Sequence, residues 1–401
     1  MLQLRSEHPG LNVLTFVALA GTMAMMAFVA VIGPVVRLLG LAEWHAGLSM
    51  TAAGVLWMLA ARYWGGLSDR IGRKRVLVIA LAAYTVIYTV LALFVDVALQ
   101  HPPAVIVSVA MLVGARALVG LFYAAVPPAA AAHVADHALP GKRVGAMARL
   151  GAANAVGMVV GPMAAGWIAL YDLALALYVA TLLPLLSLIL IGWRLPDSAR
   201  VSSRHGETPQ VGWRDARLRL PIYAAFVAMI SVMVTQVTVG FFAIDRLQLS
   251  PEEGARVAGM ALTAVGIGLI VSQGVMTRIE WLPARWLLLG AGLASVGFGG
   301  VAFVQAQWQL LAVYGLAGVG MGLVRPSLQA LTADSVEAHE QGAAAGLVAS
   351  IQGLGMVVAP LTGTLLYRWW PSAPYLLVGG LLLILAFAVV RHRPNRIGGI
   401  Q

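Results

Sequence analysis

The chain has 401 residues, of which 60% are apolar and 10% are charged, and its mean hydropathy is +0.87. Because soluble domains are roughly 45–50% apolar and about 25% charged, this composition excludes an ordinary soluble protein and predicts an all-α protein that crosses a lipid bilayer many times. The net charge of +10 follows the expected membrane orientation, so we expect no nucleic-acid partner. The absence of cysteine excludes disulfides and thiolate metal sites.

Twelve apolar runs are each long enough to cross a bilayer core of about 30 Å, which needs roughly 20 helical residues. The first run is far longer than the core of a signal peptide, so we interpret it as a retained helix. In chain order the runs are 11–38, 46–66, 76–97, 103–130, 143–169, 173–193, 220–243, 255–276, 285–304, 308–331, 342–367 and 373–390.

One long polar stretch separates the sixth run from the seventh. It predicts two six-helix bundles, at residues 1–193 and 220–401, joined by a cytoplasmic linker at 194–219. The fold class that follows is a polytopic membrane protein with twelve transmembrane helices in two related halves.

The distribution of Lys and Arg predicts the orientation. An even number of spans places both termini on one side, and segments rich in Lys and Arg stay in the cytoplasm. With both termini inside, 21 of the 26 Lys and Arg lie on cytoplasmic segments and helix ends, Arg325 among them. The other five are Arg116, within a span, and four outer residues, Arg37, Arg246, Arg256 and Arg368.

Two sequence matches relate the halves. The segment "VPPAAAAHVAD" (126–136) matches "VRPSLQALTAD" (324–334), and "GMVVGP" (157–162) matches "GMVVAP" (355–360). Both pairs are separated by 198 residues. Repeated bundles in parallel orientation are typical of alternating-access transporters, which bind substrate at the repeat interface near the middle of the membrane.

The segment "WGGLSDRIGRKRVL" (64–77) concentrates charge between the second and third runs. A glycine there permits a tight turn, and we expect the charged residues to pair with one another, with helix ends and with an acid at the inner end of the fourth span. Such a cluster would lock one state of a carrier. The alternative is that the basic residues only anchor the loop at the membrane surface. The predicted gating residues are Gly65, Asp69, Arg70, Gly72, Arg73, Lys74 and Asp136.

The fifth run carries Gly157, Gly161, Pro162 and Gly166. Small residues at four-residue spacing let two helix backbones approach closely, and a proline inside a helix removes a backbone donor and can bend it. We expect this helix to lie at the bundle interface and to control which side opens. Ordinary glycine packing is the alternative, since the chain has 44 glycines.

These motifs resemble those of the major facilitator superfamily. Residues 65–74 resemble its signature loop, "LVGARALVG" around Arg116 is similar to its intramembrane arginine motif, and the Gly157–Gly166 pattern looks like the antiporter motif of its 12-helix drug:proton exporters, the group of the multidrug and tetracycline exporters. The resemblance implies two bundles that rock about a central cavity. It also implies proton-coupled efflux of small organic molecules across the inner membrane of a bacterium.

Only Arg116 is expected near the middle of a span, where an arginine costs about 2.5–3.5 kcal/mol. It would receive a substrate anion, organise a proton path, or bond to carbonyls between helices. Exporters of the resembled group usually carry a carboxylate in the first helix, whereas this helix has Thr22, Met23, Met25 and Met26 there. With a central cation and no central acid, we expect a neutral or anionic substrate.

The remaining lining would be apolar with scattered polar groups. We expect the substrate and proton pathway to include Arg116, Tyr123, Met26, Asn154, Gln236, Tyr314 and Gln352, with Trp57, Met233 and Gln273 as further candidates.

Several classes of function lack their sequence signals. No nucleotide loop, catalytic triad or zinc spacing is found, so we expect no enzyme activity, no cofactor and no metal, although "HVADH" superficially offers metal ligands. The expected protein is a monomeric proton-coupled exporter of small molecules. The alternative is a dedicated exporter of an endogenous anionic metabolite such as a siderophore.

Overall fold

The computed structural model describes residues 9–137, 143–196, 212–279, 281–337 and 340–391. Throughout this part of the chain the regular structure is helical, because lipid offers no hydrogen bonds and each spanning backbone must satisfy its own. The helices are α1 (Pro9–Leu38), α2 (Glu43–Ile71), α3 (Arg73–Gln100), α4 (Val105–Tyr123), α5 (Val126–His137), α6 (Arg143–Ile168), α7 (Leu173–Arg194), η1 (Ala216–Leu218), α8 (Arg219–Leu247), α9 (Pro251–Met276), α10 (Pro283–Gly300), η2 (Val301–Phe303), α11 (Gln307–Asp334), α12 (Gln341–Trp369) and α13 (Ala373–Arg391).

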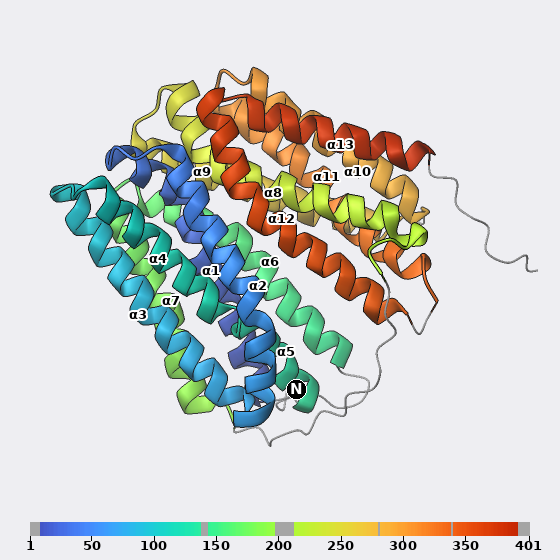
Figure 1. Ribbon diagram of the computed structural model, residues 1–401, viewed down its shortest axis with the longest axis horizontal. Helices are drawn as coiled ribbons and strands as arrows, with labels where there is room; N and C mark the ends of the chain where they lie inside the picture. The colour runs from blue at the N-terminus through green and yellow to red at the C-terminus, as the bar shows by residue number, and fades with distance from the viewer. Residues whose placement is uncertain (1–8, 138–142, 197–211, 280, 338–339, 392–401) are drawn as a thin grey trace, which may run out of the picture.

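Two six-helix bundles make up the molecule, and they lie side by side in Figure 1. Eleven of the described helical segments, with α4 and α5 taken together, are long and apolar enough to span a membrane. The twelfth span is α2, which is equally long, with 29 residues, but more polar. The predicted fold class is therefore confirmed.

The fourth span differs from its prediction as one helix over 103–130. The structure divides it at Ala124 and Ala125 into α4 and α5. Pro127 and Pro128 follow this break, and because proline has no N–H, the carbonyls of the preceding turn lose their helical partners. At this point the Ala125 N–H donates a hydrogen bond to the Phe122 carbonyl over 3.1 Å, three residues back in the chain, which is the tighter pattern of a 3₁₀ turn.

Contacts between the bundles gather in one half of the molecule. Near the end of α1, a Cβ on Gly33 would lie 3.2 Å from the Phe241 nitrogen of α8. In the first half of α2, the Thr51 hydroxyl donates to the Val357 carbonyl of α12 over 2.8 Å. Figure 1 shows the bundles diverging from this end toward the end where α1 begins and α13 finishes. We call these the closed end and the open end.

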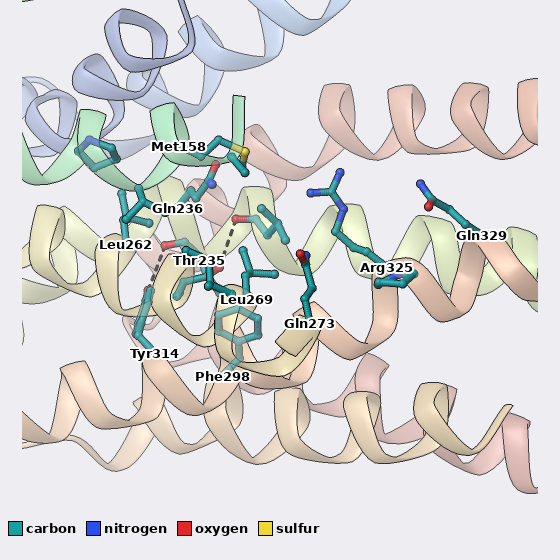
Figure 2. A pocket seen from close by; sticks show the side chains of 18 residues that line it. Met158, Thr235, Gln236, Leu262, Leu269, Gln273, Phe298, Tyr314, Arg325 and Gln329 are labelled. Carbon is teal, nitrogen blue, oxygen red and sulfur yellow. Dashed lines mark hydrogen bonds between the residues drawn. The ribbon is translucent and has the colours of Figure 1, made fainter. Parts of the chain in front are cut away.

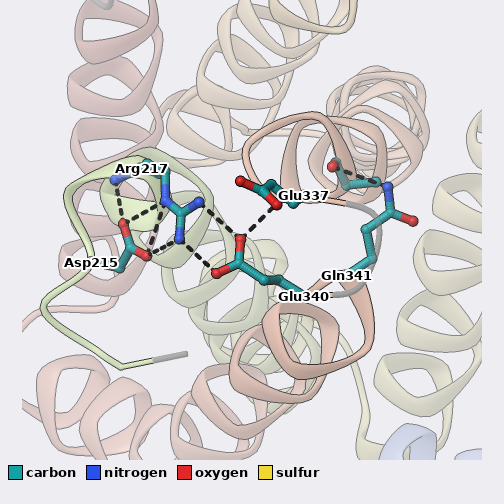
Figure 3. A network of polar contacts seen from close by, with 6 residues as sticks. Asp215, Arg217, Glu337, Glu340 and Gln341 are labelled. Carbon is teal, nitrogen blue, oxygen red and sulfur yellow. Dashed lines mark hydrogen bonds and ion pairs between the residues drawn. The ribbon is translucent and has the colours of Figure 1, made fainter. Parts of the chain in front are cut away.

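At the open end, a polar network ties the start of α8 to the start of α12 (Figure 3). Arg217 of η1 forms ion pairs with Asp215, at 2.8 Å, and with Glu340, at 2.9 Å. The hydrogen bond from the Arg217 side chain is the main reason that the pKa of Asp215 is lowered below its ordinary value. The network lies where the predicted linker joins the second bundle; residues 197–211 of that linker lie outside the described residues.

Candidate functional site

A cavity of about 290 Å³ lies between the two bundles, lined by α1, α2, α4, α5 and α6 on one side and α8, α11 and α12 on the other. A second lobe of about 250 Å³ continues between α6, α8, α9, α10 and α11, and a third of about 50 Å³ extends between α1, α2, α4, α8 and α12. Gln236 lines all three lobes. The second lobe reaches Gln273 and Gln329, close to the last turns of α9 and α11, so the cavity extends toward the open end.

Methionine dominates the wall of the main lobe. Thioether side chains are flexible and polarizable, and they adapt to ligands of varied shape. Seven of the 16 methionines in the chain line this lobe: Met25, Met26, Met158, Met229, Met233, Met321 and Met356. The run in the first helix supplies two of them, and the others come from five positions on α6, α8, α11 and α12.

A polar group on the N-terminal bundle faces this apolar wall. The Thr22 hydroxyl of α1 donates to Oδ1 of Asn154 on α6 over 2.7 Å and lies 3.5 Å from the Tyr123 hydroxyl. The Tyr123 ring stands edge-on to Trp57, with centroids 5.5 Å apart. Thr22, which stands in the stretch where the resembled exporters carry an acid, therefore anchors a neutral hydrogen-bonded group.

Arg116 lies behind the main lobe and lines only the smallest one. It is 2% exposed, its guanidinium carbon is 4.4 Å from the centre of the Phe28 ring, and its Nε and Nη1 have no hydrogen-bond partner. A cation over an aromatic face is stabilised electrostatically. Arg116 thus stays inside the N-terminal bundle, with its charge near the cavity and not in its centre.

A second arginine, Arg325 of α11, projects into the cavity (Figure 2). It lines both large lobes and stands nine residues before the end of its helix. Arg325 is not among the predicted pathway residues. Arg325 lies six residues from the end of the predicted span, and a residue count along a helix cannot show that a cavity reaches that far into the bundle.

Gln236, Gln352 and Tyr314 also line the cavity, with different surroundings. Gln236 has a buried Oε1 without a hydrogen-bond partner. Gln352 lines the main lobe from α12. Tyr314 presents its ring to the second lobe, whereas its hydroxyl donates to the Thr235 carbonyl over 3.0 Å. The structure thus gathers all seven predicted pathway residues around the three lobes, and their roles stay predictions.

The 198-residue repeat also appears in the cavity wall. Equivalent positions of the two halves face each other across the main lobe because the bundles are related copies. The lining pairs are Tyr123 with Met321, Pro127 with Arg325, Asn154 with Gln352 and Met158 with Met356. Arg325 stands in the matched segment 324–334, but its equivalent there is Pro127, so the repeat carries no signal of a charged residue in the wall.

The glycine motif of α6 divides between two partner helices. A Cβ on Gly157 or Gly161 would lie 2.7 Å from a carbonyl oxygen of α1, at Leu19 or Met23. On the other side of the helix, a Cβ on Gly166 would lie 2.8 Å from the Ala255 carbonyl of α9.

Pro162 also lies at this second face, because Gly259 of α9 packs against its carbonyl oxygen. The helix is therefore held to its own bundle by one face and to the opposite bundle by the other.

The charged loop between α2 and α3 turns at Gly72, whose φ of 97° lies in the region that favours glycine. Arg73 reaches Asp136 of α5, with Nε 3.3 Å from Oδ2, and also donates to the Ser68 hydroxyl over 3.0 Å.

The other predicted gating residues of this loop differ in their exposure. Arg70 is exposed, and a Cβ on Gly65 would meet nothing within 4 Å. Lys74 is half-buried at the start of α3. The side chain of Asp69 lies outside the described residues.

An ion cluster at the closed end joins the bundles, and sequence reasoning did not bring its members together. Arg37 Nη2 lies 2.7 Å from Glu43 Oε1 and 2.5 Å from Asp245 Oδ2 of the opposite bundle. The Tyr367 hydroxyl of α12 donates to the same Asp245 oxygen over 2.8 Å. Arg37 and Asp245 are separated by 208 residues, and no local pattern predicts their contact.

The fold and its motifs agree with comparisons to known proteins. A family model described as Major Facilitator Superfamily matches residues 13–306 and 247–398. The chain belongs to this superfamily. It is 25% identical over 364 residues to the class C tetracycline resistance protein of Escherichia coli, covering 87% of both chains. It is 24% identical over 332 residues to a multidrug resistance efflux pump homologue of Lactococcus lactis, covering 81% of this chain and 79% of that one.

Solved transporters of this superfamily share the fold. A bacterial homologue of the human lysosomal transporter Spinster, in an inward-facing and occupied conformation, superposes with a TM-score of 0.71 at 15% identity, over 95% of this chain and 96% of that one. A bacterial homologue of ferroportin in an inward-facing state gives 0.72 at 14% identity, over 98% and 100%. The protein is therefore a membrane transporter and not an enzyme, as its sequence predicts.

Proposed function

We propose that this superfamily member exports small organic molecules from the bacterial cytoplasm in exchange for protons. The observation that carries the proposal is the methionine-lined cavity between the bundles. Contacts between the bundles close one end of this cavity, and the cavity extends toward the other end. Alternating access requires such a central site in a molecule whose halves can rock about it. The efflux-type relatives support the direction of transport.

In this proposal the closed end faces the outside and the open end, with both termini, faces the cytoplasm. The positive residues of the loop at α2 and α3 and of the linker support this orientation. The bundles are at residues 1–193 and 220–401, and one chain suffices for transport, because both halves of the cavity come from the same chain.

The two motifs act at opposite ends. The Arg73–Asp136 pair stabilises the arrangement of α2, α3 and α5 at the cytoplasmic surface, where Gly65, Asp69, Arg70, Gly72 and Lys74 complete the loop. The α6 motif is the hinge: α6 must move with α1, against which Gly161 packs, while α9 slides past Pro162 and Gly166.

The test uses everted membrane vesicles with an imposed proton gradient and a pH-sensitive dye. Neutral, anionic and cationic compounds are added in turn to vesicles with the wild type and with Gly161→Leu. We expect proton efflux with neutral or anionic compounds and its loss in the variant. Substrate movement that leaves the proton gradient unchanged would refute proton coupling.

A dedicated exporter of an anionic metabolite, such as a siderophore, is the second candidate. What favours it is Arg325 in the cavity wall together with the lack of Asp and Glu among the lining residues. A response to one metabolite class, with silence toward the general compounds, would favour this candidate.

A further inference from the structure

We propose that the cavity selects organic anions and that Arg325 binds their negative group. The inference rests on the proposed function, because it takes the cavity as the site at which substrate is carried. The ligand class is an amphiphile that joins a carboxylate to an aromatic or aliphatic body.

Arg325 is a charged side chain without a partner in the described structure. A charged side chain within a membrane-spanning helix usually pairs with an acid or marks a substrate pathway. The guanidinium of Arg325 is exposed to the cavity and makes no hydrogen bond or ion pair within the described ranges. An arginine that only stabilised the fold would be expected to bind carbonyl or carboxylate oxygens, so this side chain has its donors available for a ligand.

The neighbours of Arg325 in the cavity are mainly amides and apolar side chains. Figure 2 shows Arg325 and Gln273 pointing into the same space, with Gln236 and Met158 across it. None of the residues that line the three lobes is an Asp or Glu. Gln236 lines all three lobes, so its side chain adds an amide to the wall around the ligand. A carboxylate would therefore meet amide and guanidinium donors without a competing acid.

The charges that line the cavity are positive. Arg116 places a second positive charge at the N-terminal side of the cavity, at the edge of its smallest lobe. In a cavity with low-dielectric walls, charges of one sign concentrate ligands of the opposite sign. Both arginines attract anions, and both repel the lipophilic cations that a methionine-lined wall would otherwise accept.

The shape of a guanidinium suits a carboxylate in particular. A guanidinium presents paired N–H donors that match the two oxygens of a carboxylate, and such charge-assisted bonds are stronger than neutral ones. The flexible methionines opposite would accept bodies of different shape. The site should therefore be strict about charge and tolerant about the rest of the molecule.

The experiment measures binding to purified protein in nanodiscs, without a proton gradient. The probes share one ring system: 1-naphthylacetate is anionic, 1-naphthylacetamide is neutral and 2-(1-naphthyl)ethylammonium is cationic. We expect the anion to bind at least tenfold more tightly than the amide and the cation to bind most weakly. In Arg325→Gln the Kd of the anion should rise about 10–100-fold, while that of the amide changes less than twofold.

Two further variants separate recognition from structure. Arg325→Lys keeps the charge and should retain part of the preference. Arg278→Gln removes an exposed arginine outside the cavity and should leave all three affinities unchanged, which controls for net charge.

The proposal is overturned if the anion does not bind at millimolar concentration, if the three probes bind equally to the wild type, or if Arg325→Gln weakens anion and amide alike. Anion-selective binding in a protein that moves no protons in vesicles would instead overturn proton coupling alone.

Discussion

Replacing Asp245 with asparagine should loosen the closed end of the molecule. Asp245 receives both the Arg37 guanidinium and the Tyr367 hydroxyl, and Arg37 belongs to the opposite bundle. Asparagine keeps the size and an acceptor for the tyrosine but removes the charge. Only the interbundle ion pair is therefore lost, and the state in which these residues separate becomes more populated.

The magnitude follows from the exposure of the pair. Both side chains are 30% exposed, between the surface case of about 0–1 kcal/mol and the buried case of about 3–5 kcal/mol. Glu43 still neutralises Arg37 in the variant, which limits the loss. We expect about 1–2 kcal/mol, which is a shift of roughly 5–30-fold in the ratio of molecules that are open at this end to molecules that are closed there.

The assay takes advantage of the absence of cysteine, since labels attach only where a cysteine is introduced. Spin labels at His101 and Gln305, exposed residues at the closed end of opposite bundles, report the distance between the bundles. Asp245→Asn should increase the long-distance population, and Glu252→Gln, which removes a half-buried charge at the same end, should not. Identical distance distributions in Asp245→Asn and the wild type would refute the gate.

Two other substitutions test the motifs. Gly161→Leu should abolish transport while the protein still reaches the membrane, because the added side chain would press on the Met23 carbonyl. Gly151→Leu on the same helix, where a Cβ meets nothing within 4 Å, should transport normally. Equal activity of the two variants would mean that the motif serves only ordinary helix packing. Asp136→Arg should reduce transport, measured as substrate movement in vesicles, at least tenfold. Adding Arg73→Asp should restore part of it, because the swap restores the ion pair. No recovery in the double variant would remove the pair from the gating mechanism.

The sequence allowed the twelve spans and the two bundles to be predicted, because hydropathy and the 198-residue repeat are properties of single segments and of their spacing. The same repeat aligns Arg325 with Pro127, an uncharged residue that was not among the predicted lining residues, so the charged position in the cavity was not predicted. Tertiary features were also out of reach. The contact of Arg37 with Asp245 depends on how two bundles meet, and whether the cavity extends to Arg325 depends on how far they diverge.

The charge of the substrate and the energetics of transport are connected. Exchange of one proton for a neutral molecule moves one positive charge inward per cycle, which the membrane potential favours by about 2.3 kcal/mol per 100 mV. If the substrate is the monoanion that Arg325 would bind, its outward movement adds a second charge, and the voltage contribution is about twice as large. No cavity carboxylate is then needed to balance a cationic ligand, which agrees with the acid-free lining of the three lobes.

This reasoning predicts different voltage dependence for matched substrates. In vesicles whose potential is clamped with potassium and valinomycin, the equilibrium accumulation ratio of 1-naphthylacetate should rise about twice as steeply, on a logarithmic scale, as that of 1-naphthylacetamide. A slope for the anion equal to that of the amide would mean that only the charge of the anion itself moves in each cycle, so that no net proton is exchanged for it.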